Sequence, residues 1–238
     1  FRVTAGLQEA HGAHRVFDSP LAEGGIAAVA FGMGINGLRP VMEIQFADYI
    51  FPAYDQIVNE MAKLRHRSGG EFWTPVTIRT PAGGGIRGGH HHSQSPEAQF
   101  THTPGLKVVY CSNPYNAKGL LTSAIECNDP VVFFEPKRCY RGPFYGDPHK
   151  VPTWNSHPDG EVPEDYYSIP LEQARIVKEG GACTVIAWGT MVHVAEEAMR
   201  IRVQGSAIQL VSSVPPSPVL RGFLPDWSAS GLSQQVIQ

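Results

Sequence analysis

The segment from Arg39 to Gly70, RPVMEIQFADYIFPAYDQIVNEMAKLRHRSGG, limits the possible folds more than any other part of this chain. Met42–Phe46 suit a buried strand, and from Asp55 onward apolar residues recur at the spacing of an amphipathic helix. The glycine pair Gly69–Gly70 ends that helix after a last turn rich in basic side chains. A strand, a sharp turn and a long helix in direct succession predict a unit of an open α/β sheet.

The turn inside this segment carries the polar and aromatic residues Gln45, Asp48 and Tyr49. In open α/β sheets, ligands bind beyond the carboxyl ends of the strands, which is where this turn is expected. Residues 45–49 are therefore candidates for a ligand pocket. A packed aromatic turn without a ligand explains the same pattern, and position along the chain does not separate the two.

Strand and helix patterns alternate along the first 135 residues. The predicted strands are Arg15–Asp18, Met42–Phe46, Val76–Thr80, Leu106–Cys111 and Val131–Glu135, and the predicted helices are Ala22–Asn36, Tyr54–Arg67 and Asn116–Cys127. Repeated βα units predict an α/β fold with a doubly wound, mostly parallel sheet.

The periodicity stops in residues 140–167, which are rich in Pro, Gly, Asp and His and too long for an ordinary loop. This segment is interpreted as a linker between a first domain, residues 1–139, and a second α/β domain, residues 168–238. The second domain is expected to contain strands at Ala174–Lys178, Thr184–Ala187 and Ala207–Val211 and a helix at Val192–Ile201. After about residue 203 its pattern fades, so the second domain is expected to be incomplete.

Composition excludes several classes of function. The net charge is −3 and the basic residues are scattered, which predicts neither a nucleic-acid partner nor a polybasic membrane surface. No apolar run approaches the roughly 20 residues that a membrane-spanning helix needs. The four cysteines lack CxxC spacing, which is typical of reduced thiols in a cytosol or mitochondrial matrix.

Three further features allow more than one interpretation. The glycine-rich loop Gly83–Gly89 could bind phosphate, but it lacks the features of a nucleotide-binding loop and fits a flexible loop that needs positive φ. His90–His92 could bind zinc, although adjacent side chains point in different directions and a single working histidine fits better. Glu23 could be a partner of a helix dipole or a carboxylate in a pocket.

Several long motifs together resemble one family, the β subunits of thiamin-diphosphate-dependent 2-oxo acid dehydrogenases, and most of all the branched-chain (2-oxoisovalerate) type. The resemblance runs from Phe1 to about Arg200, and it rests on DSPLAEGGI, PVMEIQFADYIFPAYDQIVNEMAKLRHRSGG, HHHSQSPEAQF, NPYNAKGLLTSAIECNDPVVFFEPKRCY and VIAWGTMVHVAEEA. FADYIFPAYDQIVNE and HSQSPEA distinguish it from the pyruvate relatives.

The resemblance implies a transketolase-like pyrimidine-binding domain and a division of the cofactor site between subunits. Glu23 matches the glutamate that hydrogen-bonds the cofactor's pyrimidine ring, Tyr49 matches the residue that lies against this ring, and Gln45 is nearby. His92 matches the histidine that faces the substrate, and Glu23 and His92 are the implied catalytic residues. The chain has no GDG segment, so an α subunit is expected to hold Mg²⁺ and the diphosphate.

The family further implies a heterotetramer with α subunits, a lipoyl-bearing acyltransferase core and a small 2-oxo acid substrate. It implies a cytoplasmic location in a bacterium and a matrix location in a eukaryote. It also implies a potassium ion, held mostly by backbone oxygens near Thr77, Ala124, Cys127 and Asp129. Relative to the family, the amino-terminal part of the first domain is expected to be missing from this sequence.

Four alternatives stay open from the sequence. Two have the same fold, a pyruvate or an acetoin dehydrogenase β subunit, and a substrate panel separates them from the branched-chain enzyme. A metal-dependent hydrolase built on His90–His92 would contain stoichiometric zinc. A non-catalytic fragment of such a subunit would bind partners without turnover.

Overall fold

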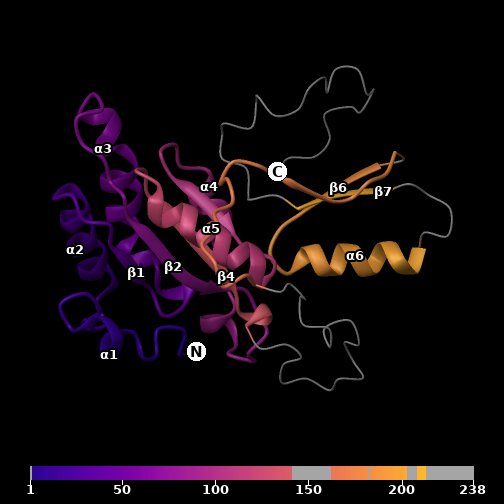
Figure 1. Cartoon of the computed structure of the whole chain (residues 1–238), viewed down its shortest axis with the longest axis horizontal. Helices are drawn as coiled ribbons and strands as arrows, with labels where there is room; N and C mark the ends of the chain where they lie inside the picture. Colours follow the sequence, from indigo (N-terminus) through magenta and orange to yellow (C-terminus); the bar gives the residue numbers. More distant parts are fainter. Residues whose placement is uncertain (1, 141–161, 182, 203–207, 213–238) are drawn as a thin grey trace.

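The computed structural model describes residues 2–140, 162–181, 183–202 and 208–212, which form two sheets flanked by helices (Figure 1). The strands are β1 (Val41–Glu43), β2 (Thr77–Ala82), β3 (Lys107–Tyr110), β4 (Val131–Pro136), β5 (Arg175–Lys178), β6 (Cys183–Ala187) and β7 (Ile208–Ser212). The helices are α1 (Leu7–His11), α2 (Glu23–Ile35), α3 (Ala62–Arg67), α4 (Glu97–Thr101), α5 (Pro114–Glu126) and α6 (Met191–Arg202).

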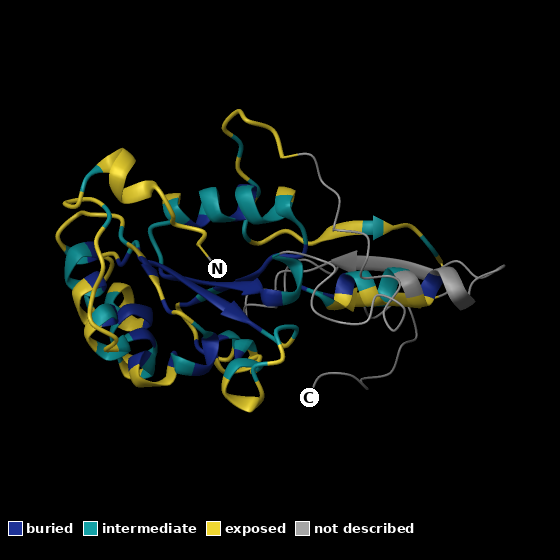
Figure 2. Cartoon of the chain, turned by 90° about the horizontal axis from the view of Figure 1, so that it is seen from below, coloured by how far each residue is buried: buried dark blue, intermediate teal, exposed yellow. Residues whose placement is uncertain are grey.

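The first sheet has four parallel strands in the order β1-β2-β4-β3. Its central strands β2 and β4 are buried at every position, as the dark blue arrows of Figure 2 show. One face of the sheet packs against α2, α4 and the turns after β1, and the opposite face packs against α5. Helices on both faces of a parallel sheet confirm the predicted doubly wound α/β fold.

The sheet core is built from side chains that alternate between the two faces. Phe133 and Phe134 are adjacent in β4, yet they belong to the two different apolar clusters because successive strand residues point to opposite faces. The Phe134 ring lies 5.9 Å from the Phe100 ring and 5.8 Å from the Tyr110 ring. The continuous apolar run of β4 is thus explained by burial on both sides.

A charged network lies inside the same sheet. The Arg79 guanidinium of β2 lies 2.6 and 3.0 Å from the two carboxylate oxygens of Glu135 in β4 and 3.2 Å from Glu43 in β1. The Tyr140 hydroxyl also donates to Glu135. Buried charges are tolerated when they are paired and hydrogen-bonded in this way.

The chain after β1 forms two short 3₁₀ turns, η1 (Ala47–Tyr49) and η2 (Phe51–Ala53), before the long helix begins. The predicted helix Tyr54–Arg67 is confirmed, but its middle, Gln56–Met61, is wound as a π-helix that continues into α3. Ile57 and Met61 are buried in this segment. Local π-helical winding is frequent next to functional sites.

The strand predicted at Arg15–Asp18 is wrong. These residues form a turn and an irregular, largely exposed segment. A strand needs a neighbouring strand for its backbone hydrogen bonds, and in the described part of the chain β1 forms the edge of the first sheet on this side. Local propensity alone could not show that no partner strand lies beside residues 15–18.

The second sheet has three strands in the order β5-β7-β6, with β5 antiparallel and β6 parallel to β7. Helix α6 covers one face through Val192 and Met199, which pack with Ala187. All four predicted elements of this region are confirmed within a few residues of their expected bounds. Figure 1 shows this sheet beside the first one.

Residues 162–171 attach the second region to α5. Ile169 donates its N–H to the Gly119 carbonyl, and Ser123 donates to the Ile169 carbonyl at 2.6 Å. A Cβ at Gly119 would come within 2.6 Å of the Ile169 side chain and 2.7 Å of the Tyr167 ring, so the approach depends on glycine. Most of the predicted linker, residues 141–161, lies outside the described residues, and the predicted domain bounds stay predictions.

None of the helices in the described part of the chain combines the length and apolar character that a bilayer crossing requires.

Candidate functional site

Three aromatic rings meet at the carboxyl ends of β1 and β2. Phe46 and Tyr49 follow β1, and His92 follows β2 in the turn η4 (His90–His92). The His92 ring centroid lies 4.5 Å from that of Phe46 and 5.7 Å from that of Tyr49, with both pairs edge to face. The structure therefore brings together Tyr49 and His92, 43 residues apart, at the strand ends where the sequence predicted a ligand pocket.

Hydrogen bonds favour one tautomer of His92. Its Nδ1 lies 3.1 Å from the Gly88 carbonyl oxygen, and its Nε2 lies 3.4 Å from the Tyr49 hydroxyl. A carbonyl oxygen can only accept, so Nδ1 carries the proton in the neutral ring and Nε2 accepts from the Tyr49 hydroxyl. The basic nitrogen of His92 thus faces Tyr49.

The glycine-rich loop allows this placement of His92. Gly83, Gly85 and Gly89 have φ values of 75°, 124° and 64°, which agrees with the interpretation as a loop that needs positive φ. A side chain at Gly88 would collide with the Cβ of His92. The glycines therefore let the loop fold back on the histidine that follows it.

His90 and His91 differ from His92. Both are exposed, and their rings lie 3.8 Å apart, centroid to centroid. Within the described ranges, no group of three or more His, Cys, Asp or Glu side chains is arranged to hold a metal ion.

Beneath the aromatic cluster lies a buried ion pair that joins the ends of β1, β2 and β4. The Asp48 Oδ1 accepts hydrogen bonds from the backbone N–H groups of Ser93 and Gln94, each at 3.1 Å. The Asp48 Oδ2 lies 3.8 Å from the Nζ of Lys137, and both side chains are essentially inaccessible to solvent, at 1% and 0%.

Lys137 also lies 3.5 Å from the Pro81 carbonyl oxygen and 5.1 Å from the centre of the Phe46 ring. Burial lowers the pKa of Lys137, and Asp48 opposes that shift. Sequence reasoning noted Asp48 only as a polar turn residue and missed Lys137. The signal was present, because Lys137 directly follows the buried strand β4 and so lies at the same sheet edge as His92.

Glu23 and Gln45 are the two remaining residues that the sequence predicted for the site. Glu23 is the first residue of α2 and is half-buried, and the strand predicted before it, Arg15–Asp18, does not form. The start of α2 packs against η2, where a Cβ at Gly24 would come within 3.0 Å of the Pro52 carbonyl oxygen. Gln45 is exposed. Among the described residues, no hydrogen bond joins Glu23 or Gln45 to Tyr49 or His92.

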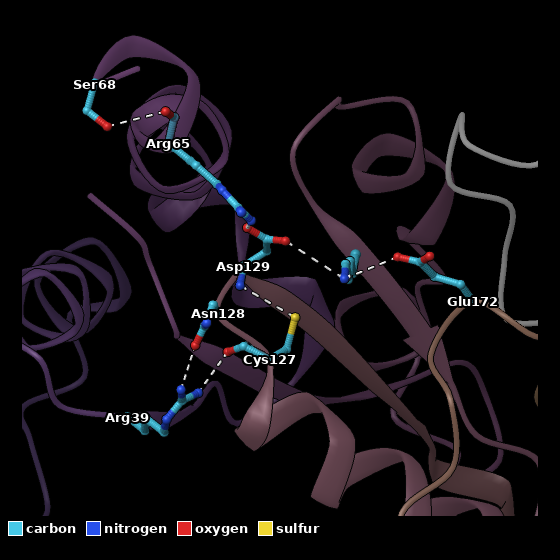
Figure 3. Close-up of polar contacts among 8 residues, drawn as sticks. Arg39, Arg65, Ser68, Cys127, Asn128, Asp129 and Glu172 are labelled. Atoms are coloured by element: carbon cyan, nitrogen blue, oxygen red, sulfur yellow. Dashed lines mark hydrogen bonds and ion pairs between the residues drawn. The ribbon is translucent and has the colours of Figure 1, made fainter. Parts of the chain in front are cut away.

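The turn after α5, where potassium was expected, is surrounded by basic side chains (Figure 3). The Arg39 guanidinium, from the loop before β1, donates to the carbonyl oxygens of Ile125 and Cys127 at 3.0 Å each. It also donates to the Asn128 side chain at 2.5 Å. A cation at the carboxyl end of a helix suits the helix dipole.

The Asp129 carboxylate of this turn lies 2.6 Å from Arg65 and 3.8 Å from Lys107. Thr77 and Ala124 are buried beside the turn. The oxygens near these residues are the kind that potassium prefers, but Arg39 already satisfies two carbonyl groups. The potassium site therefore stays a prediction.

Comparison with known proteins places these features in a family. The profile of the transketolase pyrimidine-binding domain matches residues 1–143. The chain is 57% identical over 199 residues to the 2-oxoisovalerate dehydrogenase subunit beta of Pseudomonas aeruginosa, covering 83% of this chain and 57% of that protein. It is 52% identical over 202 residues to the mitochondrial 2-oxoisovalerate dehydrogenase subunit beta of Dictyostelium discoideum, covering 84% of this chain and 50% of that protein.

A pyruvate dehydrogenase β subunit from Acholeplasma laidlawii is 46% identical over 220 residues, covering 92% of this chain and 63% of that protein. The chain thus spans only 50–63% of the length of these three relatives.

Solved structures show the same fold. A split-gene transketolase, described as an inactive β4 tetramer, matches with a TM-score of 0.61 at 20% identity, over 89% of this chain and 60% of that chain. The transketolase from Leishmania mexicana matches with a TM-score of 0.59 at 18% identity, over 86% of this chain and 27% of that chain. The fold and the motifs agree: this chain belongs to the transketolase pyrimidine-binding domain family, and the three relatives that are 46–57% identical to it are β subunits of 2-oxo acid dehydrogenases.

Proposed function

We propose that this chain is the cofactor-binding part of the β subunit of a branched-chain 2-oxo acid dehydrogenase, which decarboxylates its substrate oxidatively and passes the acyl group to lipoamide. The observation that carries the proposal is the convergence of Phe46, Tyr49 and His92 at the carboxyl ends of β1 and β2. In a pyrimidine-binding domain, this edge combines aromatic surface with a titratable histidine. The similarity to 2-oxoisovalerate dehydrogenase β subunits supports the substrate class.

The residues present suit the aminopyrimidine half of thiamin diphosphate. Tyr49 is half-buried and would offer its ring to a flat heterocycle, and the exposed Gln45 of the same segment would offer an amide. The Glu23 carboxyl group, at the start of α2, would in its protonated form donate a hydrogen bond to a pyrimidine ring nitrogen, which can only accept. When bound, the cofactor supplies a nucleophilic carbon and an electron sink for loss of CO2 from a 2-oxo acid.

His92 is the proposed proton carrier near the substrate. Its Nδ1–H is held by the Gly88 carbonyl, so Nε2 is the nitrogen that exchanges a proton. The Tyr49 hydroxyl contacts that nitrogen at 3.4 Å and would hold it until a substrate displaces the contact. A histidine with one nitrogen fixed and the other free to exchange is suited to general acid–base work.

The proposed partners follow from the family. An α subunit would supply Mg²⁺ and the diphosphate contacts in a heterotetramer, and a lipoyl-bearing acyltransferase core would accept the acyl group. In this scheme the chain alone binds thiamin diphosphate weakly, because the groups that neutralise the diphosphate charge lie on the partner. Calorimetric titration with the cofactor and Mg²⁺ tests this, and tight binding by the chain alone contradicts it. The location proposed is the cytoplasm of a bacterium or the matrix of a mitochondrion.

We also propose that potassium binds beside Arg39 at the turn after α5. The expected result is a higher melting temperature in KCl than in NaCl at equal ionic strength, and a larger difference in Arg39→Ala, where the carbonyls of Ile125 and Cys127 are free. Equal melting temperatures in the two salts for both proteins contradict the site.

The decisive experiment uses the full-length subunit assembled with an α subunit of a 2-oxoisovalerate dehydrogenase. Release of CO2 is measured with 3-methyl-2-oxobutanoate and with pyruvate. Glu23→Gln and His92→Ala should assemble normally but lose about 10²–10⁴-fold in turnover. His90→Ala is the matched control and should be nearly unaffected, because His90 is exposed and its ring lies against that of the exposed His91.

The alternatives predict different outcomes of the same experiment. Preference for pyruvate identifies a pyruvate dehydrogenase subunit. Equal losses for His90→Ala, His91→Ala and His92→Ala together with stoichiometric zinc favour a metal-dependent enzyme. Cofactor binding without turnover of either substrate indicates a non-catalytic subunit.

A further inference from the structure

Burial of Asp48 and Lys137 costs hydration free energy, and a gain in stability does not explain why the pair is there. Each ion loses several kcal/mol of hydration free energy on burial, and apolar replacements of such pairs are often neutral or stabilising. The separation of 3.8 Å between Asp48 Oδ2 and Lys137 Nζ is longer than a good hydrogen bond. Asp48 Oδ2 is buried and makes no hydrogen bond within the described residues. The pair is better explained by the segment that it positions than by its own contribution to stability.

The pair touches the His92 segment from two sides. Asp48 accepts the N–H groups of Ser93 and Gln94, the two residues that directly follow His92. Lys137 lies over the Phe46 ring, and Phe46 packs edge to face against the imidazole of His92. One carboxylate therefore fixes the backbone of the segment, and one ammonium group holds the ring that supports the side chain.

Both residues reach His92 from elements that the sheet brings together. Asp48 belongs to η1 after β1, Lys137 follows β4, and the segment they hold follows β2. Lys137 also lies 3.5 Å from the Pro81 carbonyl oxygen, within β2 itself. The three adjacent strands β1, β2 and β4 are thus linked at their carboxyl ends through two charges.

We propose that Asp48 and Lys137 form a positioning pair that orients the His92 imidazole against Tyr49. The two residues act through His92 and do not touch the reacting atoms. The proposal rests on the proposed function only in the claim that this orientation sets the rate. A misplacement of a catalytic group by about 1 Å can cost about 10²-fold in rate.

A charge-removal cycle separates positioning from stability. The variants are Asp48→Asn, Lys137→Met and the double variant, in the full-length subunit assembled with its α subunit. Each single variant leaves one buried charge without its partner and should melt at a lower temperature, whereas the double variant should recover the melting temperature of the unmodified protein. Arg67→Met with Glu60→Gln, an exposed pair 2.6 Å apart, is the matched control and should change neither stability nor rate.

The rate should not recover with the stability. In the double variant kcat should stay about 10–100-fold below that of the unmodified enzyme, with KM within about twofold. The neutral amide accepts the N–H groups of Ser93 and Gln94 more weakly than the carboxylate does, and the ammonium group over the Phe46 ring is gone, so His92 is held less firmly. Recovery of both melting temperature and kcat in the double variant would overturn the proposal, since the pair would then be structural only. Unchanged kcat in both single variants would overturn it as well.

A second measurement needs no turnover. Carbethoxylation of each histidine by diethyl pyrocarbonate is followed by mass spectrometry in the assembled protein. His92 should react slowly in the unmodified protein and approach the rate of the exposed His90 in the double variant. An unchanged His92 rate would overturn the positioning role even if neither 2-oxo acid is a substrate, so failure of this proposal and failure of the proposed function give different results.

Discussion

The two sheets of this molecule differ in how deeply their side chains are buried. In the first sheet β2 and β4 are buried at all positions, whereas in the second sheet β5 exposes three of four positions and β6 three of five. Figure 2 shows the contrast as dark blue strands on one side and yellow segments on the other. The first sheet has helices on both faces, while in the described residues α6 covers one face of the second.

The difference in burial explains why ion pairs in the first sheet can fix the positions of strand ends. In the first sheet a buried charge needs a partner: Arg79 pairs with Glu135 at 2.6 Å, and Asp48 pairs with Lys137 at 3.8 Å. Such pairs hold neighbouring strand ends in fixed positions, which suits a site at the sheet edge. In the second sheet Ile176 and Ile186 are about half exposed, so side chains there are less constrained.

The largest expected contrast is in the cost of removing an apolar side chain. Phe134→Ala removes a ring that is fully buried between Phe100 and Tyr110, and it should lower the free energy of unfolding by about 3–5 kcal/mol. Ile186→Ala in β6 should cost less than about 1 kcal/mol, because half of its surface is already in solvent. Urea denaturation measures both, and equal costs would remove the contrast between the sheets.

A second contrast concerns ion pairs. Arg79→Met leaves the Glu135 carboxylate buried without its guanidinium and should cost about 3 kcal/mol, since the Tyr140 hydroxyl still donates to it. Arg65→Met, which breaks the exposed pair with Asp129, should cost about 0–1 kcal/mol. Thermal unfolding of the two variants is compared, and a larger loss for Arg65→Met contradicts the assignment of Arg79 as the critical partner.

The join between the two regions gives the third prediction. Gly119→Ala places a methyl group against Ile169 and Tyr167 and should destabilise the chain by about 1–3 kcal/mol, with faster hydrogen exchange in residues 162–171. Gly32→Ala in α2 is the matched control, because a Cβ there meets no neighbouring atom, and it should stabilise the helix by about 0.5–1 kcal/mol. If both variants behave alike, the segment does not dock closely on α5.

The smallest expected effect is a pH dependence. Burial raises the pKa of the Cys139 thiol from 9.0 to about 11. Between these values the unfolded chain loses the thiol proton while the folded chain keeps it, so this stabilisation is present below pH 9 and is lost as the pH rises towards 11. At pH 10 the free energy of unfolding should have fallen by about 1 kcal/mol for this reason, and Cys139→Ala should abolish that decrease.

Cys183→Ala, in the exposed strand β6, should leave the pH dependence of unfolding unchanged. Chemical denaturation at several pH values measures both variants. A larger change in the pH dependence for Cys183→Ala than for Cys139→Ala would contradict the assignment of this effect to the buried thiol.

Much of the fold followed from local patterns. The apolar run of β4, the proline after Asn113 and the glycine pair after the long helix are signals that act over a few residues, so they could be recognised in the sequence. Helix α5 begins two residues before the predicted start, where the Asn113 side chain accepts the N–H of Asn116 as an N-cap. The second sheet was also predicted, because its strands and helix have clear periodicity.

The site was only partly predictable. The resemblance implied that Tyr49 lies against the pyrimidine ring and that His92 faces the substrate, and the structure puts the two side chains in contact. Glu23 and Gln45 keep their proposed roles from the family resemblance alone.

Tertiary structure alone decided the contacts between residues far apart in sequence. Arg39 reaches carbonyl groups 86 and 88 residues away, and Arg79 reaches Glu135 across 56 residues. Lys137 became the partner of Asp48 because parallel strands bring their carboxyl ends to one edge, whatever their order in the chain. The failure at Arg15–Asp18 has the same cause, since a strand exists only where folding places another strand beside it. Local sequence determines which elements can form, and the packing of distant elements determines which side chains meet.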